Sequence, residues 1–160
     1  KIMALLLICA SCKEDEADTG FSDQPMAGKI SDLAYTSTSG GGQAIDWVFD
    51  ESRVDITIGG ELVSEPCSYS YDGPVVSFIV LKEVGTYTLD EDWVSDASVG
   101  QYLVYLHPNG NSDPDDFIIV SDGAIEILSV TSESISGRVN ARYDDQNFVN
   151  GSFTVNYCDG

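Results

Sequence analysis

The chain has 160 residues, of which 27 are Asp or Glu and only seven are Lys or Arg, so its formal net charge at pH 7 is −20. A field of this sign repels nucleic acid and anionic membrane surfaces, which excludes nucleic acid as a partner. The length fits one domain with its own hydrophobic core.

An apolar run near the start of the chain ends at a cysteine. Residues 2–11 are apolar or small, and Cys12 is followed at once by the charged residues 13–16. Ten residues are too few to span a bilayer but suit the apolar region of a signal peptide. The pattern resembles the signal peptide and lipobox of a bacterial lipoprotein, although position −3 is Cys9, where leucine is usual. The resemblance implies cleavage before Cys12 and its acylation; the alternatives are ordinary secretion or a start assigned at the wrong residue.

Polar residues follow Cys12 and lack periodic apolar positions. Residues 13–16, Lys-Glu-Asp-Glu, are similar to the export tag of surface-displayed lipoproteins in Bacteroidota. This similarity implies an outer-membrane lipoprotein at the cell surface, with the periplasmic face as the alternative. We therefore expect a signal peptide over residues 1–11, truncated at its start, an acidic flexible tether over 12–26, and a single β domain over 27–160.

The β domain is predicted from period-2 alternation of apolar and polar residues, without sustained helical periodicity. Ile45, Trp47 and Phe49 share one face of the first such run, so we expect Trp47 in the core. Turn residues such as Gly59-Gly60 separate the runs. The one weak helix candidate is residues 90–97. The expected strands cover residues 45–50, 54–58, 75–81, 85–89, 101–106, 117–120 and 124–130.

The end of the chain predicts an antiparallel strand pair. In residues 135–143 one set of alternate positions is apolar, and a second alternating run places Phe153, Val155 and Tyr157 inward. Arg138 and Arg142 fall on the polar face, where we expect cross-strand ion pairs with carboxylates.

Cleavage before Cys12 removes Cys9, and acylation occupies Cys12, so two cysteines remain. An envelope protein matures in an oxidising compartment, so Cys67 and Cys158 are expected to form a disulfide. The alternative, a zinc site, lacks ligands because the chain has a single histidine, His107.

The last part of the chain carries a family resemblance. Residues 123–127, 135–145 and 150–153, together with Cys158, resemble the tail of an uncharacterised family of Bacteroidota lipoproteins with short β-rich domains behind a lipobox. The resemblance implies fold and location but no activity.

Catalytic motifs are missing from the sequence. It contains no Gly-x-Ser-x-Gly elbow, no His-Glu-x-x-His and no phosphate-binding loop, so we do not expect an enzyme.

Two binding sites can be proposed from loops. Oxygen-bearing side chains at every second position predict a calcium site formed by Asn109, Asn111, Asp113 and Asp115. However, Pro114 stands where an EF-hand loop needs glycine, and the alternative is a solvated acidic loop. Trp93 lies among acidic residues and is the candidate for stacking on a glycan.

Together these features predict an all-β fold, namely an antiparallel β-sandwich of about eight to ten strands. The alternative is a closed, lipocalin-like β-barrel. The expected function is that of a membrane-anchored envelope lipoprotein with a non-catalytic domain that binds a glycan or an envelope protein. A lipocalin-like carrier of a small apolar ligand and a calcium-dependent glycan-binding module are the alternatives.

Overall fold

The computed structural model describes residues 20–37, 41–46, 50–60, 67, 73–90, 102–109 and 117–158. Within these residues the chain forms strands and no helix, which confirms the all-β prediction. The strands are β1 (Ala27–Ile30), β2 (Leu33–Thr36), β3 (Gly42–Asp46), β4 (Arg53–Gly59), β5 (Val75–Leu81), β6 (Gly85–Thr88), β7 (Val104–His107), β8 (Ile118–Val120), β9 (Gly123–Val130), β10 (Ser134–Arg142) and β11 (Phe148–Tyr157).

All the strands belong to one mixed sheet in the order β6-β9-β10-β11-β3-β4-β5-β7-β8. The only parallel pairing among them joins β11 to β3, where Asn156 lies opposite Gln43 and Tyr157 opposite Ala44. β1 pairs with β11 and with β2, beside the main path. The sheet therefore consists of two antiparallel ladders that meet at one parallel pair, rather than being antiparallel throughout.

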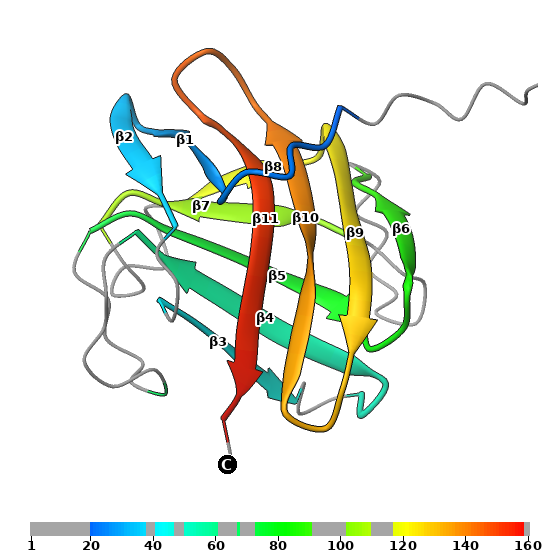
Figure 1. Cartoon of the computed structure of the whole chain (residues 1–160). Helices are drawn as coiled ribbons and strands as arrows, with labels where there is room; N and C mark the ends of the chain where they lie inside the picture. Colours follow the sequence, from blue (N-terminus) through cyan, green and yellow to red (C-terminus); the bar gives the residue numbers. More distant parts are fainter. Residues whose placement is uncertain are drawn as a thin grey trace, which may run out of the picture.

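The sheet curls so that its two halves face each other. β9, β10 and β11 form a front layer, and β3, β4, β5 and β7 run across behind it (Figure 1). Phe78 on β5 meets Phe153 on β11 edge to face, with ring centroids 5.4 Å apart, in the core between the layers.

The curled sheet remains open. β6 and β8 are the two ends of the strand path, and in the described part of the chain they do not pair with each other. The fold is therefore a half-barrel with eleven described strands, instead of the closed barrel considered as an alternative.

The strand predictions agree well with the structure from β4 onward. β10 buries Ile135, Gly137, Val139 and Ala141, as the alternation predicts. In β3 the buried apolar residue is Ala44, whereas Ile45 lies on the opposite face, across from Asp55. The expectation that the face of Ile45 points to the core is therefore wrong. Trp47, Phe49 and residues 91–97 of the helix candidate lie outside the described residues.

β1 and β2 were not expected from the sequence. They form a tight hairpin in which Ser31 and Asp32 adopt positive φ angles of 51° and 64°. Such turns usually carry Asn-Gly or Asp-Gly, so the Ser-Asp pair gives no clear signal.

Residues 20–26, within the range expected for the tether, pack against the sheet. Met26 is fully buried, and its backbone N–H donates to the carbonyl oxygen of Ser152 at 3.1 Å. Gln24 accepts a hydrogen bond from the Ser152 N–H at 2.7 Å. Residues 20–26, hereafter the N-terminal strap, are thus attached to β11, because their backbone groups complete hydrogen bonds at its edge.

The predicted disulfide between Cys67 and Cys158 is present, with Cα atoms 5.6 Å apart. It links the end of β11 to the chain between β4 and β5, 91 residues away. Cys158 also pairs its backbone N–H with the Ala44 carbonyl at 2.9 Å, so the bridge lies beside the junction of the two ladders.

Candidate functional site

The outer face of the back layer carries a band of polar and aromatic side chains on three neighbouring strands. Alternation turns Val54, Ile56 and Ile58 inward, so the residues between them point away from the core. The register places Thr57, Ser77 and Tyr105 side by side on β4, β5 and β7. We call this band the outer-face cluster; it consists of Asp55, Thr57, Ser77, Tyr105, His107 and Phe117.

Asp55 is the unusual residue of the outer-face cluster. It lies between two apolar neighbours, Ile45 on β3 and Ile79 on β5. No described residue donates a hydrogen bond to its carboxylate or forms an ion pair with it. Arg53, two residues along the same face, instead pairs with Asp50 at 3.3 Å. Burial raises the pKa of Asp55 to about 6, because the ionised form loses hydration without gaining a partner.

Ser77 and His107 form a hydrogen-bonded pair, with Oγ and Nε2 separated by 2.9 Å. Burial lowers the pKa of His107, so the imidazole is neutral at pH 7. Its Nδ1 atom is buried and has no hydrogen-bond partner in the structure described. The pair therefore differs from a hydrolytic triad, in which a carboxylate accepts from Nδ1 and orients the ring.

Aromatic rings border the cluster. Tyr105 packs edge to face against Phe117, with centroids 5.5 Å apart, and His107 lies 5.9 Å from the same ring. Burial, and secondarily the negative charge of Asp55, raises the pKa of Tyr105. Phe117 is 37% exposed, so the edge of the cluster is open to solvent.

This cluster was missed by reasoning from sequence alone. A signal does exist, because Ser77 interrupts an otherwise apolar run and Asp55 interrupts the next strand along the sheet. However, only the pairing of β4 with β5 and β7 shows that these interruptions lie together.

Most of the residues proposed from sequence lie outside the described residues, namely Cys12, Trp93, Asn111, Asp113 and Asp115. Asn109 is described and lies two residues beyond the end of β7, so the proposed calcium loop starts near the outer-face cluster. Across the described ranges, no three His, Cys, Asp or Glu side chains gather in a way that could hold a metal ion. The calcium and stacking sites stay predictions.

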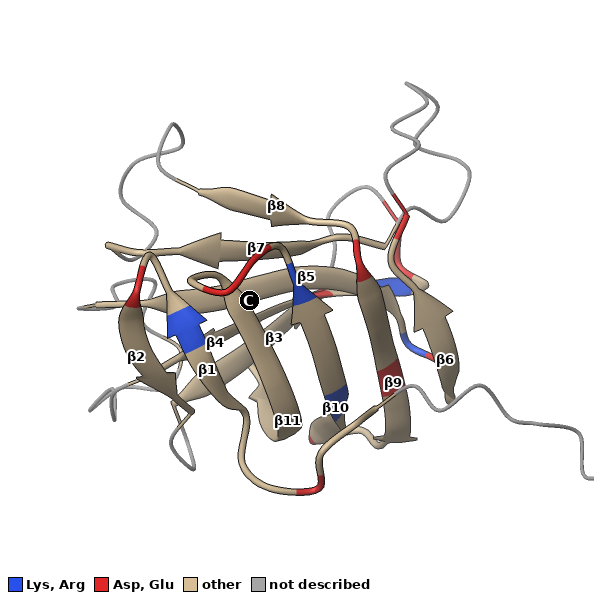
Figure 2. Cartoon of the chain, turned by 90° about the horizontal axis from the view of Figure 1, so that it is seen from above, with Lys and Arg blue, Asp and Glu red and all other residues tan. Residues whose placement is uncertain are grey.

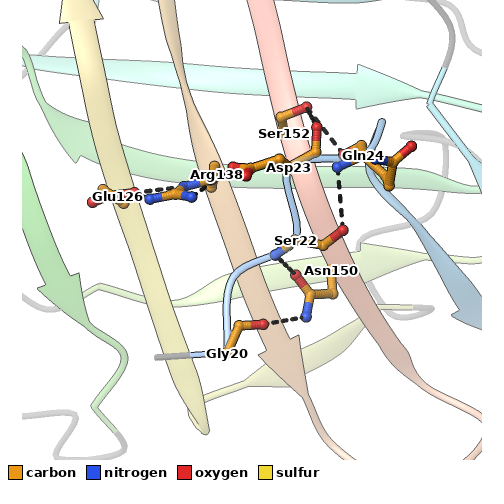
Figure 3. Close-up of polar contacts among 8 residues, drawn as sticks. All are labelled: Gly20, Ser22, Asp23, Gln24, Glu126, Arg138, Asn150 and Ser152. Carbon is orange, nitrogen blue, oxygen red and sulfur yellow. Dashed lines mark hydrogen bonds and ion pairs between the residues drawn. The ribbon is translucent and has the colours of Figure 1, made fainter. Parts of the chain in front are cut away.

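A second polar cluster lies on the outer face of the front layer, where the strap crosses it (Figure 3). Arg138 donates from Nε to Glu126 at 2.6 Å and from Nη1 to Asp23 at 2.7 Å. Its guanidinium also lies 5.3 Å from the ring centroid of Phe21. One cation thus joins β9, β10 and the strap, and the expected cross-strand ion pair of Arg138 is confirmed. Arg142 pairs with Asp145, a neighbour in its own hairpin.

Asn150 supplies the second attachment of the strap. Its Oδ1 accepts from the Ser22 N–H at 2.9 Å, and its Nδ2 donates to the Gly20 carbonyl at 2.8 Å (Figure 3). A side-chain amide that pairs both its donor and its acceptor with one backbone segment fixes the position of that segment on the strand.

Charges on the front layer are few and matched. A positively charged position on β10 lies beside a negatively charged position on β9 (Figure 2), and the register pairs Arg138 with Glu126. Among the ion pairs of the described residues, those of Arg138 join the strap to the sheet.

Comparison with known proteins gives no match: no family model, curated protein or solved structure is significantly similar to this chain. In addition, the described residues include no helix that could serve as a membrane span.

Proposed function

We propose that this protein is a membrane-anchored envelope lipoprotein whose β domain binds or interacts without catalysis. The observation that carries the proposal is the apolar run of residues 2–11 ending at Cys12, followed by acidic sequence. Its location is the outer membrane, with display on the cell surface. The resemblance to uncharacterised Bacteroidota lipoproteins belongs to the same proposal.

The strap supports an anchored arrangement. It leaves seven residues, 13–19, between Cys12 and Gly20. Fully extended, a connection of this length reaches roughly 25 Å, which is less than twice the radius of gyration of about 14 Å for a domain of this size. An acylated Cys12 would therefore keep the domain close to the membrane. Gly20, the first described residue, lies at the outer face of the front layer, so we infer that this face is the one nearest the attachment point.

The packing of the two layers favours an interaction module over a carrier. Phe78 and Phe153 meet between the layers, and fully buried side chains from both, such as Ile56 and Ile135, belong to one core cluster. A carrier needs a cavity in that position. By contrast, the outer-face cluster offers a polar and aromatic surface suited to binding.

Lipidation is testable by mass spectrometry of the protein extracted from membranes of a Gram-negative expression host. We expect the terminal residue to be Cys12 with acyl chains attached, and Cys12→Ala to leave the protein unprocessed and unacylated. Cys9→Ala is the matched control, because it removes the other cysteine of the leader and should preserve acylation. An intact leader or a free Cys12 thiol in the native protein would refute the proposal.

Display on the cell surface can be tested separately from lipidation. Proteinase K added to intact cells should digest the mature protein, while a periplasmic marker stays intact. Protection of the protein until the outer membrane is permeabilised would place it on the periplasmic face instead.

A further inference from the structure

The first part of the N-terminal strap, residues 20–23, is held to the front layer by side chains of the sheet. Asn150 accepts a hydrogen bond from the Ser22 N–H at 2.9 Å, and Arg138 donates to the Asp23 carboxylate at 2.7 Å (Figure 3). Water competes for such groups at a protein surface, so each contact of this kind adds little to stability.

The second part of the strap, residues 24–26, is held by backbone hydrogen bonds and by burial. The Ser152 N–H donates to the Gln24 carbonyl at 2.7 Å, and the Met26 N–H donates to the Ser152 carbonyl at 3.1 Å. Met26 is fully buried, and a Cβ atom at Gly151 would lie 2.5 Å from its Cα, so the two backbones are in close contact. The kind of attachment therefore changes between Asp23 and Gln24.

We propose that residues 20–23, hereafter the latch, detach from the front layer while the rest of the domain, including Met26, stays folded. Segments with few buried apolar contacts open locally at a lower free energy than core strands do. The proposal deepens the proposed anchored function and rests on it, because an open latch lengthens the connection between Cys12 and the domain.

Arg138 keeps a partner when the latch opens. Its Nε donates to Glu126 on β9 at 2.6 Å, and this pair lies within the sheet. The side chains of Arg138 and Glu126 are 23% and 21% exposed, whereas that of Asp23 is 84% exposed even in the closed state. Opening therefore leaves no half-buried charge unpaired, which is the situation that makes the loss of an ion pair costly.

Opening of the latch changes how far an anchored domain can move from the membrane. With the latch closed, the connection consists of residues 13–19, which reach roughly 25 Å when fully extended. With the latch open, it consists of residues 13–23 and reaches roughly 40 Å. The difference is close to the radius of gyration of such a domain, about 14 Å. The domain would thus have a near and a far position, and the contact of Asp23 with Arg138 favours the near one.

Native-state hydrogen exchange, measured by NMR on the full chain carrying Cys12→Ala, tests the latch. The Ser22 amide reports on the latch, and the Met26 amide reports on the part of the strap that stays folded. We expect the Ser22 amide to be protected at least tenfold less than the Met26 amide, and its protection to be insensitive to low concentrations of urea, as in local opening. Equal protection of the two amides, with the same dependence on urea, would overturn the proposal.

Two variants with the same change of charge test whether residues 20–23 open as a unit. Asp23→Asn removes the ion pair but leaves the Ser22 amide and its acceptor in place, and should lower the protection of that amide at least threefold. Asp145→Asn removes an exposed carboxylate that pairs with Arg142, and should leave the protection unchanged. Unchanged protection in the Asp23 variant, or the same loss in both variants, would contradict a latch held by this ion pair.

Neutron reflectometry of the acylated protein on a supported phosphatidylcholine bilayer tests the change of reach. Asp23→Asn should increase the mean separation between the domain and the bilayer, whereas Asp145→Asn should not. Equal separations for the native protein and the Asp23 variant would refute the effect on the tether. If Cys12 proves not to be acylated, the anchored function fails, whereas the exchange experiment on the unacylated chain still decides whether the latch opens.

Discussion

Asp23 and Arg138 are separated by 115 residues in the chain, and their side chains meet at 2.7 Å. The contact links the strap to β10, and the same guanidinium donates a hydrogen bond to Glu126 on β9. Burial of Met26 directly after this contact makes the strap part of the folded domain. The position of the strap on the sheet is therefore set by tertiary contacts.

Replacing Asn150 by Ala should loosen the strap. The change removes the hydrogen bonds to Ser22 and Gly20 and should cost about 1–2 kcal/mol of the free energy of unfolding. Urea denaturation measures this cost, and limited proteolysis should show faster cleavage near residue 20. Asn156→Ala, at an exposed position on the same strand, is the control and should change neither. Equal protease sensitivity of the two variants would contradict the role of Asn150.

Gly151 is required where the strap meets β11. Its φ angle is +147°, and a Cβ atom placed there would lie 2.5 Å from the Met26 Cα. Gly151→Ala should therefore lower the free energy of unfolding by about 3 kcal/mol or more, through backbone strain and overlap together. Gly73 is the control: its φ is +97° and no atom lies within 4 Å of an added Cβ, so its replacement measures the cost of backbone strain without overlap. Gly73→Ala should cost only about 1 kcal/mol, and a similar loss for both variants would show that overlap with the strap is unimportant.

Removal of the disulfide should destabilise the domain strongly. Cys67 and Cys158 close a loop of 91 residues, for which the chain-entropy model gives an upper limit of about 4–5 kcal/mol. The double variant Cys67→Ser/Cys158→Ser should melt at a markedly lower temperature in calorimetry. Reductant should lower the melting temperature of the native protein and leave that of the double variant unchanged. Equal melting temperatures for native and double-variant proteins would refute this expectation.

Asp55 makes stability depend on pH. Its pKa is raised from 3.8 to about 6 in the folded protein, so the folded state binds the proton more tightly than the unfolded state does. The stabilisation from this proton is fully present below pH 3.8 and is lost as the pH rises through 6. Asp55→Asn should therefore increase the free energy of unfolding at pH 7 by up to about 3 kcal/mol, with the difference vanishing near pH 4.

Chemical denaturation at several pH values measures this effect. Asp32→Asn is the control, because that carboxylate is exposed and paired with Lys29. An Asp55→Asn variant whose stability relative to the native protein does not change with pH would contradict the assignment of the titrating group.

The alternation of apolar residues along the chain was enough to predict the all-β class and most strands from β4 onward. It also predicts the inward faces of β10 and β11, since a buried face imposes a period of two on the sequence. The disulfide followed from the small number of cysteines. These properties depend on local pattern and on composition, both of which are visible in a single sequence.

Other features were decided by contacts between distant residues. The parallel pairing of β11 with β3 brings together the two ladders, and no local signal specifies it. Ile45 faces outward because Ala44 fits against the core, which depends on how closely β3 approaches the other layer. The turn at Ser31 and Asp32 likewise follows from docking of the hairpin, because the Ser31 N–H donates to Asn147 in the loop that precedes β11.

The class of fold, the cross-link and the acidic character of the protein can all be read from the amino-acid sequence, because each is a sum of local preferences or a count of residues. Long-range contacts determine how the strap lies on β11 and which polar residues stand together. Thr57, Ser77 and Tyr105 stand side by side on β4, β5 and β7 only when the register of these three strands is fixed. The register of these strands is set by burial of their apolar face. The arrangement of side chains on the outer face is therefore determined by the residues of the buried face.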